Sequence, residues 1–277
     1  MRRGTALSIV ILTVLASGAP AQTPQLTRDQ VYFSIARRVN AQSESPVTNI
    51  VGALDEVIEV GEITVSPEGK ATVVVKERAP STSSTTSKTI RLVMVPAGDK
   101  WAWESFEENR KLYPVEKLFP YAKDELGRRR QVVAAKWAAY LETMTKQGDS
   151  AIRVLETAKA VLQGDPPPMA AVSNARTALA EARKGQDEQA ILAAHRDLAQ
   201  AAQPVGTLTE SFEVLKANDA FLRLQEEFKA AQTGVESSRK DYLAAVAAYN
   251  EGLQRLPFAL VAYGMEFTKL DPKIESE

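Results

Sequence analysis

Two long segments of this chain carry apolar side chains at alternating steps of four and three residues, over positions 133–161 and 221–249. A seven-residue repeat of this kind is typical of a helix that packs lengthwise against a partner helix. Three consecutive prolines at 166–168 end the first segment and Pro257 ends the second, because a proline ring clashes with the preceding helical turn. Helices of this length cannot fold back on themselves, so the rest of the fold has to be built around them.

The predicted rods span residues 128–164 and 218–255, and each is about 55 Å long at a rise of 1.5 Å per residue. Two shorter helical segments, 169–183 and 187–203, lie between them in the sequence. Short connections make consecutive helices antiparallel neighbours, and a repeat of 3.5 residues implies a gentle left-handed supercoil. The sequence therefore predicts an elongated up-and-down four-helix bundle over residues 116–270.

The region before the bundle, residues 25–115, predicts a small α+β domain. A capping box at 27–30, Thr-Arg-Asp-Gln, opens a helix with apolar spacing over residues 31–41. Four segments of alternating, β-branched character then predict an antiparallel meander of strands. These segments are residues 57–65, 71–78, 88–95 and 100–106. The expected fold class is thus mainly α, with one helix and a meander preceding the bundle and a short tail at 271–277.

The first 21 residues have the composition of a secretory signal peptide. Two arginines follow Met1, residues 6–16 are apolar, and small residues precede an expected cleavage between Ala21 and Gln22. The apolar run is about half of the roughly twenty residues that a membrane-spanning helix needs. We therefore expect a periplasmic or secreted protein, with a membrane anchor formed by an uncleaved N-terminal segment as the alternative.

Composition excludes several classes of chemistry. The chain has no cysteine, which rules out disulfides, thiolate metal sites and a lipid anchor on cysteine. Lys and Arg number 34 against 35 Asp and Glu, so no excess of positive charge favours nucleic acid as a partner. The sequence also lacks the glycine-rich and histidine-containing motifs of nucleotide-binding proteins, hydrolases and metalloproteases. No cofactor and no metal site are expected.

A few polar residues are the remaining candidates for catalysis. His195 is the single histidine, and Glu226-Glu227 and Glu107-Glu108 are adjacent carboxylates. Adjacent residues on a helix point about 100° apart, so neighbouring acids do not converge on one ion or substrate. His195 has no nucleophile or base pattern beside it. We expect these side chains to be solvated, and an enzyme using His195 or the carboxylates is the least favoured alternative.

Aromatic and basic residues suggest two candidate binding sites. Trp101 and Trp103 alternate along the last predicted strand and project from the same face. With Tyr32 and Phe33 of the first helix they either line a concave pocket or form the core between helix and sheet. The run Arg128–Arg130 either docks on a partner or membrane surface, or is a solvated helix face.

The end of the second rod raises a separate question, because Tyr249-Asn250 is followed so soon by Pro257 and an apolar stretch. We expect the amide of Asn250 to bridge to a neighbouring helix, since it lies beside the apolar stripe. Residues 258–263 are too few to span a bilayer, so they are expected to fold back and close the end of the bundle.

The second rod also carries a motif that resembles the LemA family. Its most specific part is the stretch 215–227, LKANDAFLRLQEE. Further matching positions are Arg239, Tyr242, Val246, Tyr249, Asn250 and Pro257. The resemblance covers roughly residues 130–270 and implies a long helical bundle in a bacterial envelope protein, without an assigned reaction.

The chain also departs from the family pattern. Leu243 follows Tyr242 where the family usually has a second Tyr-Asn pair, and Glu266 stands where a glycine is expected. In place of the transmembrane anchor that usually precedes the bundle, this chain has a signal peptide and an α+β domain. The inserted domain makes its topology a matter for the structure to decide.

These observations predict a non-enzymatic extracytoplasmic protein that acts as a helical scaffold or protein-interaction module. Its expected partner is another envelope protein or a second copy of the chain, with at most peripheral membrane contact and no nucleic acid. The alternative is a small-molecule or peptide binding protein that uses the α+β domain as a cradle.

Overall fold

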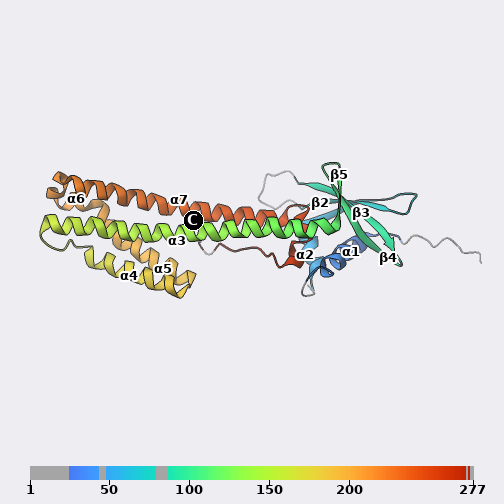
Figure 1. Cartoon of the computed structure of the whole chain (residues 1–277), viewed down its shortest axis with the longest axis horizontal. Coiled ribbons are helices and arrows are strands. Elements are labelled where there is room, and N and C mark those ends of the chain that lie inside the picture. The colour runs from blue at the N-terminus through green and yellow to red at the C-terminus, as the bar shows by residue number, and fades with distance from the viewer. Residues whose placement is uncertain (1–24, 44–47, 79–86, 273, 275–277) are drawn as a thin grey trace, which may run out of the picture.

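The computed structural model describes residues 25–43, 48–78, 87–272 and 274. The predicted signal peptide and its cleavage site, Ala21 and Gln22, lie outside these residues. Figure 1 shows an elongated and mainly helical molecule, with a β-sheet and two short helices at one end and a rod of long helices extending from them. The end of the rod next to the sheet is called proximal below, and the opposite end distal.

Within the described residues, two helices precede the sheet. Helix α1 (Arg28–Asn40) begins with the predicted capping box: the Gln30 amide donates to the Thr27 hydroxyl, and the Thr27 amide donates to the Gln30 side chain. Helix α2 (Ile50–Val57) was not predicted. Its glycine and β-branched residues are poor helix formers, so packing of Ile50 and Leu54 into the core decides its conformation.

The sheet is an antiparallel meander with strand order β1-β2-β3-β4-β5. The strands are β1 (Ile58–Val65), β2 (Ala71–Glu77), β3 (Thr89–Ala97), β4 (Lys100–Glu108) and β5 (Lys111–Pro114). The first four agree with the predicted strands, and the short fifth strand was missed. Alternate side chains of β2, β3 and β4 are buried, and α1 packs against β4 to complete the core of this sheet domain.

Helix α3 (Leu118–Leu162) is the longest element and follows β5 through a single 3-10 turn, η1 (Val115–Lys117). Its 45 residues make a rod of roughly 65 Å. It begins ten residues earlier than predicted, so the rod grows directly out of the sheet domain. Pro120 falls in its first turn, where a missing amide breaks no intrahelical hydrogen bond.

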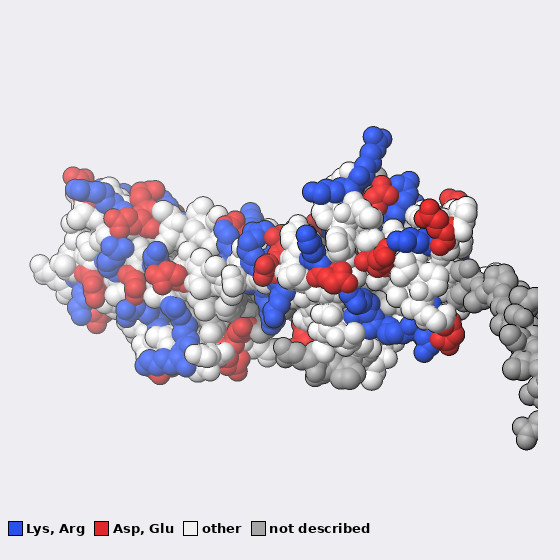
Figure 2. All heavy atoms as spheres, turned by 45° about the vertical axis from the view of Figure 1, so that its right-hand side comes forward, with Lys and Arg blue, Asp and Glu red and all other residues white. Residues whose placement is uncertain are grey.

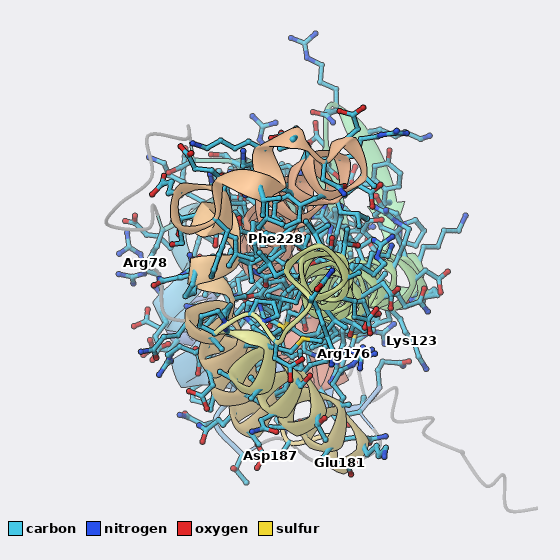
Figure 3. All side chains as sticks on the ribbon, turned by 90° about the vertical axis from the view of Figure 1, so that its left-hand side faces the viewer. Arg78, Lys123, Arg176, Glu181, Asp187 and Phe228 are labelled. Atoms are coloured by element: carbon cyan, nitrogen blue, oxygen red, sulfur yellow. The ribbon has the colours of Figure 1, made fainter. Side chains whose placement is uncertain are left out.

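Helix α7 (Asp219–Gln254) runs antiparallel to α3 along most of its length (Figure 1). The two predicted stripes face each other: every stripe position from 133 to 161 on α3 and from 221 to 249 on α7 is buried or half-buried. Figure 3 looks along the rod from its distal end and shows Phe228 of α7 among the helices, while Glu181 and Asp187 lie at the periphery. The seven-residue pattern therefore identified the packing face correctly.

Helices α4 (Met169–Gly185) and α5 (Glu188–Ala202) form a hairpin beside the distal part of α3. Two 3-10 turns, η2 (Gln203–Thr207) and η3 (Glu213–Ala217), and the short α6 (Leu208–Ser211) lead back to α7. The hairpin is too short to follow α3 to the sheet (Figure 1). The sequence predicted an up-and-down four-helix bundle with two long and two shorter helices. The long helices are present, and among the described residues the proximal part is a pair, α3 with α7, while the α4–α5 hairpin lies beside the distal part.

The surface carries mixed charge. In the view of Figure 2, Lys and Arg alternate with Asp and Glu along both the rod and the sheet domain. None of the described helices is both long and apolar enough to cross a membrane.

Candidate interdomain site

The proximal end of the rod is joined to the sheet domain by the segment that follows α7. After Gln254 the chain forms two 3-10 turns, η4 (Phe258–Leu260) and η5 (Ala262–Met265), that contact α2. Its buried residues are Leu256, Pro257, Phe258, Ala259, Leu260, Val261, Ala262 and Gly264. The segment thus folds back as expected, and the space it fills lies between the rod and the sheet domain.

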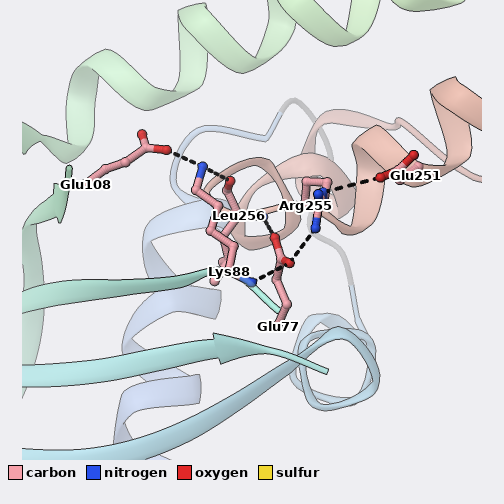
Figure 4. Close-up of polar contacts among 6 residues, drawn as sticks. All are labelled: Glu77, Lys88, Glu108, Glu251, Arg255 and Leu256. Carbon is pink, nitrogen blue, oxygen red and sulfur yellow. Dashed lines mark hydrogen bonds and ion pairs between the residues drawn. The ribbon is translucent and has the colours of Figure 1, made fainter. Parts of the chain in front are cut away.

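Glu77, at the end of β2, is the centre of the polar contacts at this junction (Figure 4). Its side chain is 6% exposed. Oε1 accepts a hydrogen bond from the Leu256 amide at 2.8 Å. Oε2 accepts from the Lys88 amide at 2.8 Å and from Arg255 Nη1 at 3.0 Å. A buried carboxylate with three donors, one of them cationic, is fully compensated for its loss of water.

Lys88, the residue just before β3, completes these contacts. Its Nζ forms an ion pair with Glu108 of β4 and donates to the Leu256 carbonyl at 2.7 Å. Arg255 also reaches Glu251 of α7, at 3.4 Å between Nε and Oε1. We call Glu77, Lys88, Glu108, Arg255 and Leu256 the junction cluster. It connects three strands to the end of α7 and fixes the direction in which the rod leaves the sheet.

Gly264 makes a second contact between the two parts. Its carbonyl accepts a hydrogen bond of 2.6 Å from the Ser43 hydroxyl, just after α1. A Cβ at this position would lie 1.9 Å from Val39 Cγ1 and 2.9 Å from Ser43 Oγ. The backbone of η5 therefore approaches α1 closely enough that only glycine fits.

We expect Gly264→Ala to lower the free energy of unfolding by about 2–3 kcal/mol, because the added methyl has to push α1 and η5 apart. Urea unfolding followed by circular dichroism measures the change. Gly234→Ala in α7 is the matched control, since a Cβ there meets nothing within 4 Å. That control is expected to be neutral or stabilising by up to about 1 kcal/mol. Equal losses at the two positions would contradict the close approach at Gly264.

The chain then turns back along α7 as an extended tail, which two residues of the helix hold. The Tyr249 hydroxyl donates to the Thr268 carbonyl at 3.1 Å. Asn250 donates from Nδ2 to the Leu270 carbonyl at 2.7 Å and accepts from the Leu270 amide at 2.8 Å. We call Tyr249 and Asn250 the tail clasp. The expectation that Asn250 bridges to a neighbouring helix was wrong, because its amide pairs with the tail backbone.

Two hollows flank the beginning of the tail. One, of about 230 Å³, lies between residues 264–267, residues 42–43 and Lys123. The other, of about 210 Å³, lies between the tail at 267–269, α2 and the end of α7. Its walls are mostly apolar, from Ala53, Leu54, Val57, Leu253, Ala259 and Ala262. Residues 264–269 therefore do not fill the space around them.

The four aromatic residues for which the sequence left a pocket and a core open as alternatives do not converge on one cavity. Trp101 and Trp103 are 1% and 2% exposed and belong to the core between α1 and the sheet. Tyr32 is buried with its hydroxyl 3.2 Å from the Ile58 carbonyl oxygen and from Asp55 Oδ1, and burial raises its pKa. Phe33 is 56% exposed and lines a separate hollow on the outside of α1. The structure thus places the tryptophans where the core interpretation expects them.

The basic run lies on the proximal part of α3. Arg128 and Arg129 both pair with Glu125, and the hydrogen bond from Arg129 lowers the pKa of that carboxyl. Arg129 also donates to the Ala248 carbonyl of α7 at 3.2 Å. Arg130 is exposed, and its charge acts on Tyr249. Only part of the run is therefore available to a partner, and that part lies close to the tail clasp.

The sequence suggested that His195 is a solvated surface residue, but the structure places it half-buried against α3. Nε2 lies 2.9 Å from Oε1 of Gln147, which is buried in α3, and the imidazole ring meets Tyr140 edge-on. Burial lowers the pKa of His195 to about 4. The neutral ring therefore fixes the position of α5 on α3. No group among the described residues completes it into a catalytic set.

Lowering the pH is expected to reduce stability through His195. The unfolded chain binds this proton near pH 6.5, whereas the folded chain binds it only near pH 4, so stability is lost as the pH falls from 6.5 toward 4. The loss between pH 7 and pH 5 is at most about 2 kcal/mol. Urea unfolding of the wild type and of His195→Gln at both pH values measures it. A difference in free energy between these two proteins that stays constant with pH would contradict the buried neutral ring.

The paired acids are engaged separately. Glu226 pairs with Lys229 and Glu227 with Arg153, while Glu107 pairs with Arg91. Across the described part of the chain, no group of three or more metal-ligating side chains comes together. Glu108 pairs with Lys88 in the junction cluster. The two carboxylates of each adjacent pair therefore form ion pairs with different basic side chains and do not converge on one site.

The C-terminal half of the chain matches a known protein family. Residues 136–273 match the model of the LemA family, which confirms the resemblance seen in the sequence. The match begins within α3 and includes the α4–α5 hairpin, α7 and the tail clasp, but it leaves out the sheet domain. A search of curated proteins finds no match to the chain.

Proposed function

Since residues 136–273 of this chain belong to the LemA family, we propose that the protein is a non-enzymatic envelope component that acts as a helical scaffold outside the cytoplasm. The LemA family is associated with the bacterial envelope and is not known as an enzyme family. In this proposal the rod holds a binding surface at its distal end at a fixed distance from the sheet domain. Each end meets a different protein of the envelope.

The observation that carries this proposal is the buried and hydrogen-bonded contact between the two parts at the junction. The buried carboxylate of Glu77 receives donors from both parts, and the apolar segment 256–262 fills the space between them. Interfaces that are buried and fully hydrogen-bonded do not hinge easily. A scaffold needs this property, whereas a flexible tether between two domains would lack it.

The two ends of the molecule offer different surfaces to partners. At the distal end Val214 is 55% exposed, and on the sheet domain Val65 and Leu112 are 48% and 58% exposed. Arg128 and Arg130 add exposed positive charge at the base of the rod. Exposed apolar side chains rimmed by charge are typical of protein contacts, although each of these is small.

The test is site-specific photo-cross-linking in intact cells, with a photoreactive residue at Val214, at Leu112 or at Ala138. Ala138 is exposed in the middle of the rod and serves as the control. We expect discrete adducts from the first two positions, with different partner masses, and none from Ala138. Adducts that are absent at both ends, from a chain that accumulates in the envelope, would contradict the scaffold role.

A further inference from the structure

We propose that the surface of α7 beside the tail clasp is a binding site for an extended peptide segment of a partner protein, and that the chain's own tail occupies it in this structure. This inference rests on the proposed function, which holds that the protein binds partner proteins, and it adds the kind of segment that one partner presents. The occupant is a stretch of extended chain whose apolar residues are spaced like Phe267, Leu270 and Ile274.

The polar contacts of the site recognise backbone rather than side chain. Asn250 offers one donor and one acceptor to the amide and carbonyl of a single residue, Leu270, as a neighbouring β-strand would. Tyr249 adds a donor to the Thr268 carbonyl two residues earlier. Any extended peptide presents the same groups at the same spacing, so these hydrogen bonds do not require the tail's own sequence.

Apolar contacts determine which peptide sequences the site selects. Ile274 is 8% exposed, and Phe267 and Leu270 are partly buried and pack against the core. The side chains between them, Lys269 and Asp271, are exposed. A partner segment therefore needs apolar residues at steps of three and four, with no constraint on the residues between.

The tail is held in a way that permits exchange. Hollows of about 230 and 210 Å³ lie beside residues 265–269, which are half-buried or exposed, so this stretch forms contacts on a limited part of its surface. Three hydrogen bonds from the clasp hold the backbone at Thr268 and Leu270. A peptide that makes the same three bonds and fills the hollows better gains contacts that offset the tail's advantage of being attached to the same chain.

The direct test uses a chain that ends at Glu266 and a fluorescent peptide of residues 267–274, which the shortened chain lacks. We expect saturable binding of the peptide to this shortened chain, measured by fluorescence anisotropy, and at least tenfold weaker binding to the full chain, whose tail competes. Asn250→Ala in the shortened chain removes two hydrogen bonds and is expected to weaken binding by about tenfold to hundredfold. Lys240→Ala, at an exposed position of the same helix, is expected to change nothing.

A shortened chain that is folded by circular dichroism and does not bind, or that binds equally well with Asn250→Ala, overturns the proposal. If the shortened chain does not fold, hydrogen exchange on the full chain decides: an excess of unlabelled peptide must speed exchange at the Leu270 amide, and no acceleration overturns it. If the full chain is a dimer and the chain that ends at Glu266 is not, the site binds the tail of a second copy. That outcome also contradicts the proposal, which assigns the site to a different protein. Because both components are purified, failure here is distinct from failure of cross-linking in cells.

Discussion

Replacing Glu77 with alanine is expected to lower the free energy of unfolding by about 3–5 kcal/mol, one of the two largest effects that we predict for a single substitution. The change leaves the amides of Lys88 and Leu256 without their acceptor and Arg255 without its buried partner. Buried amide donors that lose their acceptor are costly. Arg255 adds less to the loss, because its side chain is 37% exposed and it keeps Glu251 as a partner. Urea unfolding followed by circular dichroism and by tryptophan fluorescence measures the loss.

Glu251→Ala provides the matched control for Glu77. It removes the other carboxylate that pairs with Arg255, but at an exposed position, 59% accessible, where an ion pair contributes at most about 1 kcal/mol. We also expect Glu77→Ala to produce two unfolding transitions. With Trp137 of α3 replaced by Phe, the fluorescence of Trp101 and Trp103 reports unfolding of the sheet domain before the rod loses its helicity. Similar losses for Glu77→Ala and Glu251→Ala would show that the junction cluster does not connect the two parts.

Replacing Trp101 with alanine is expected to cost about 3–5 kcal/mol as well, because a large side chain that is 1% exposed leaves a cavity between α1 and β4. The Ser34 hydroxyl bonds the Trp101 carbonyl at 2.8 Å, so the loss of the ring also loosens a contact that α1 makes with the strand backbone. The measurement is the urea midpoint and slope, which together give the free energy of unfolding.

Phe33→Ala is the control for Trp101, since its ring is 56% exposed on the opposite side of α1. We expect a change within about 0.5 kcal/mol. A small loss for Trp101→Ala together with retained structure would favour an open aromatic cradle, which is the interpretation that the buried tryptophans argue against.

The long helices could be predicted because the seven-residue apolar repeat is a strong sequence signal for a helix that packs along a partner helix. The heptad stripe depends only on local spacing, and tertiary packing follows the same pattern along α3 and α7. The start of α3 was missed because Pro120 and Gly127 interrupt helical propensity, although Leu118, Ala122 and Leu126 are buried and continue the apolar face. At the start of α3 the apolar pattern therefore predicts the helix better than the presence of proline and glycine does.

The fifth strand was missed because its turn lacks the usual glycine. Asn109 and Arg110 adopt left-handed backbone angles, with φ of 52° and 63°, and connect β4 to β5 in a two-residue hairpin. Such hairpins normally carry Asn-Gly, and an arginine at the second position gives no comparable signal. Asparagine after β4 was the only local indication of this turn.

The junction could not be predicted from local pattern. Glu77 and Leu256 are 179 residues apart in the sequence, and nothing near either residue indicates that they meet. His195 was misplaced for the same reason, since its partner Gln147 comes from another helix. Asn250 was correctly identified as a bridging residue, but its partner in the tail lies in a segment without secondary-structure signal.

The pairing of α3 with α7 alone in the proximal part has a consequence for evolution of the rod. Lys136 of α3 and Asp241 of α7 lie at the same level, with 2.6 Å between Nζ and Oδ2. Seven residues inserted into both helices at this level would restore every contact above and below it, and would extend the reach of the distal tip by about 10 Å. The rod can therefore lengthen or shorten in evolution by whole heptads, without any change in the sheet domain or in the distal end.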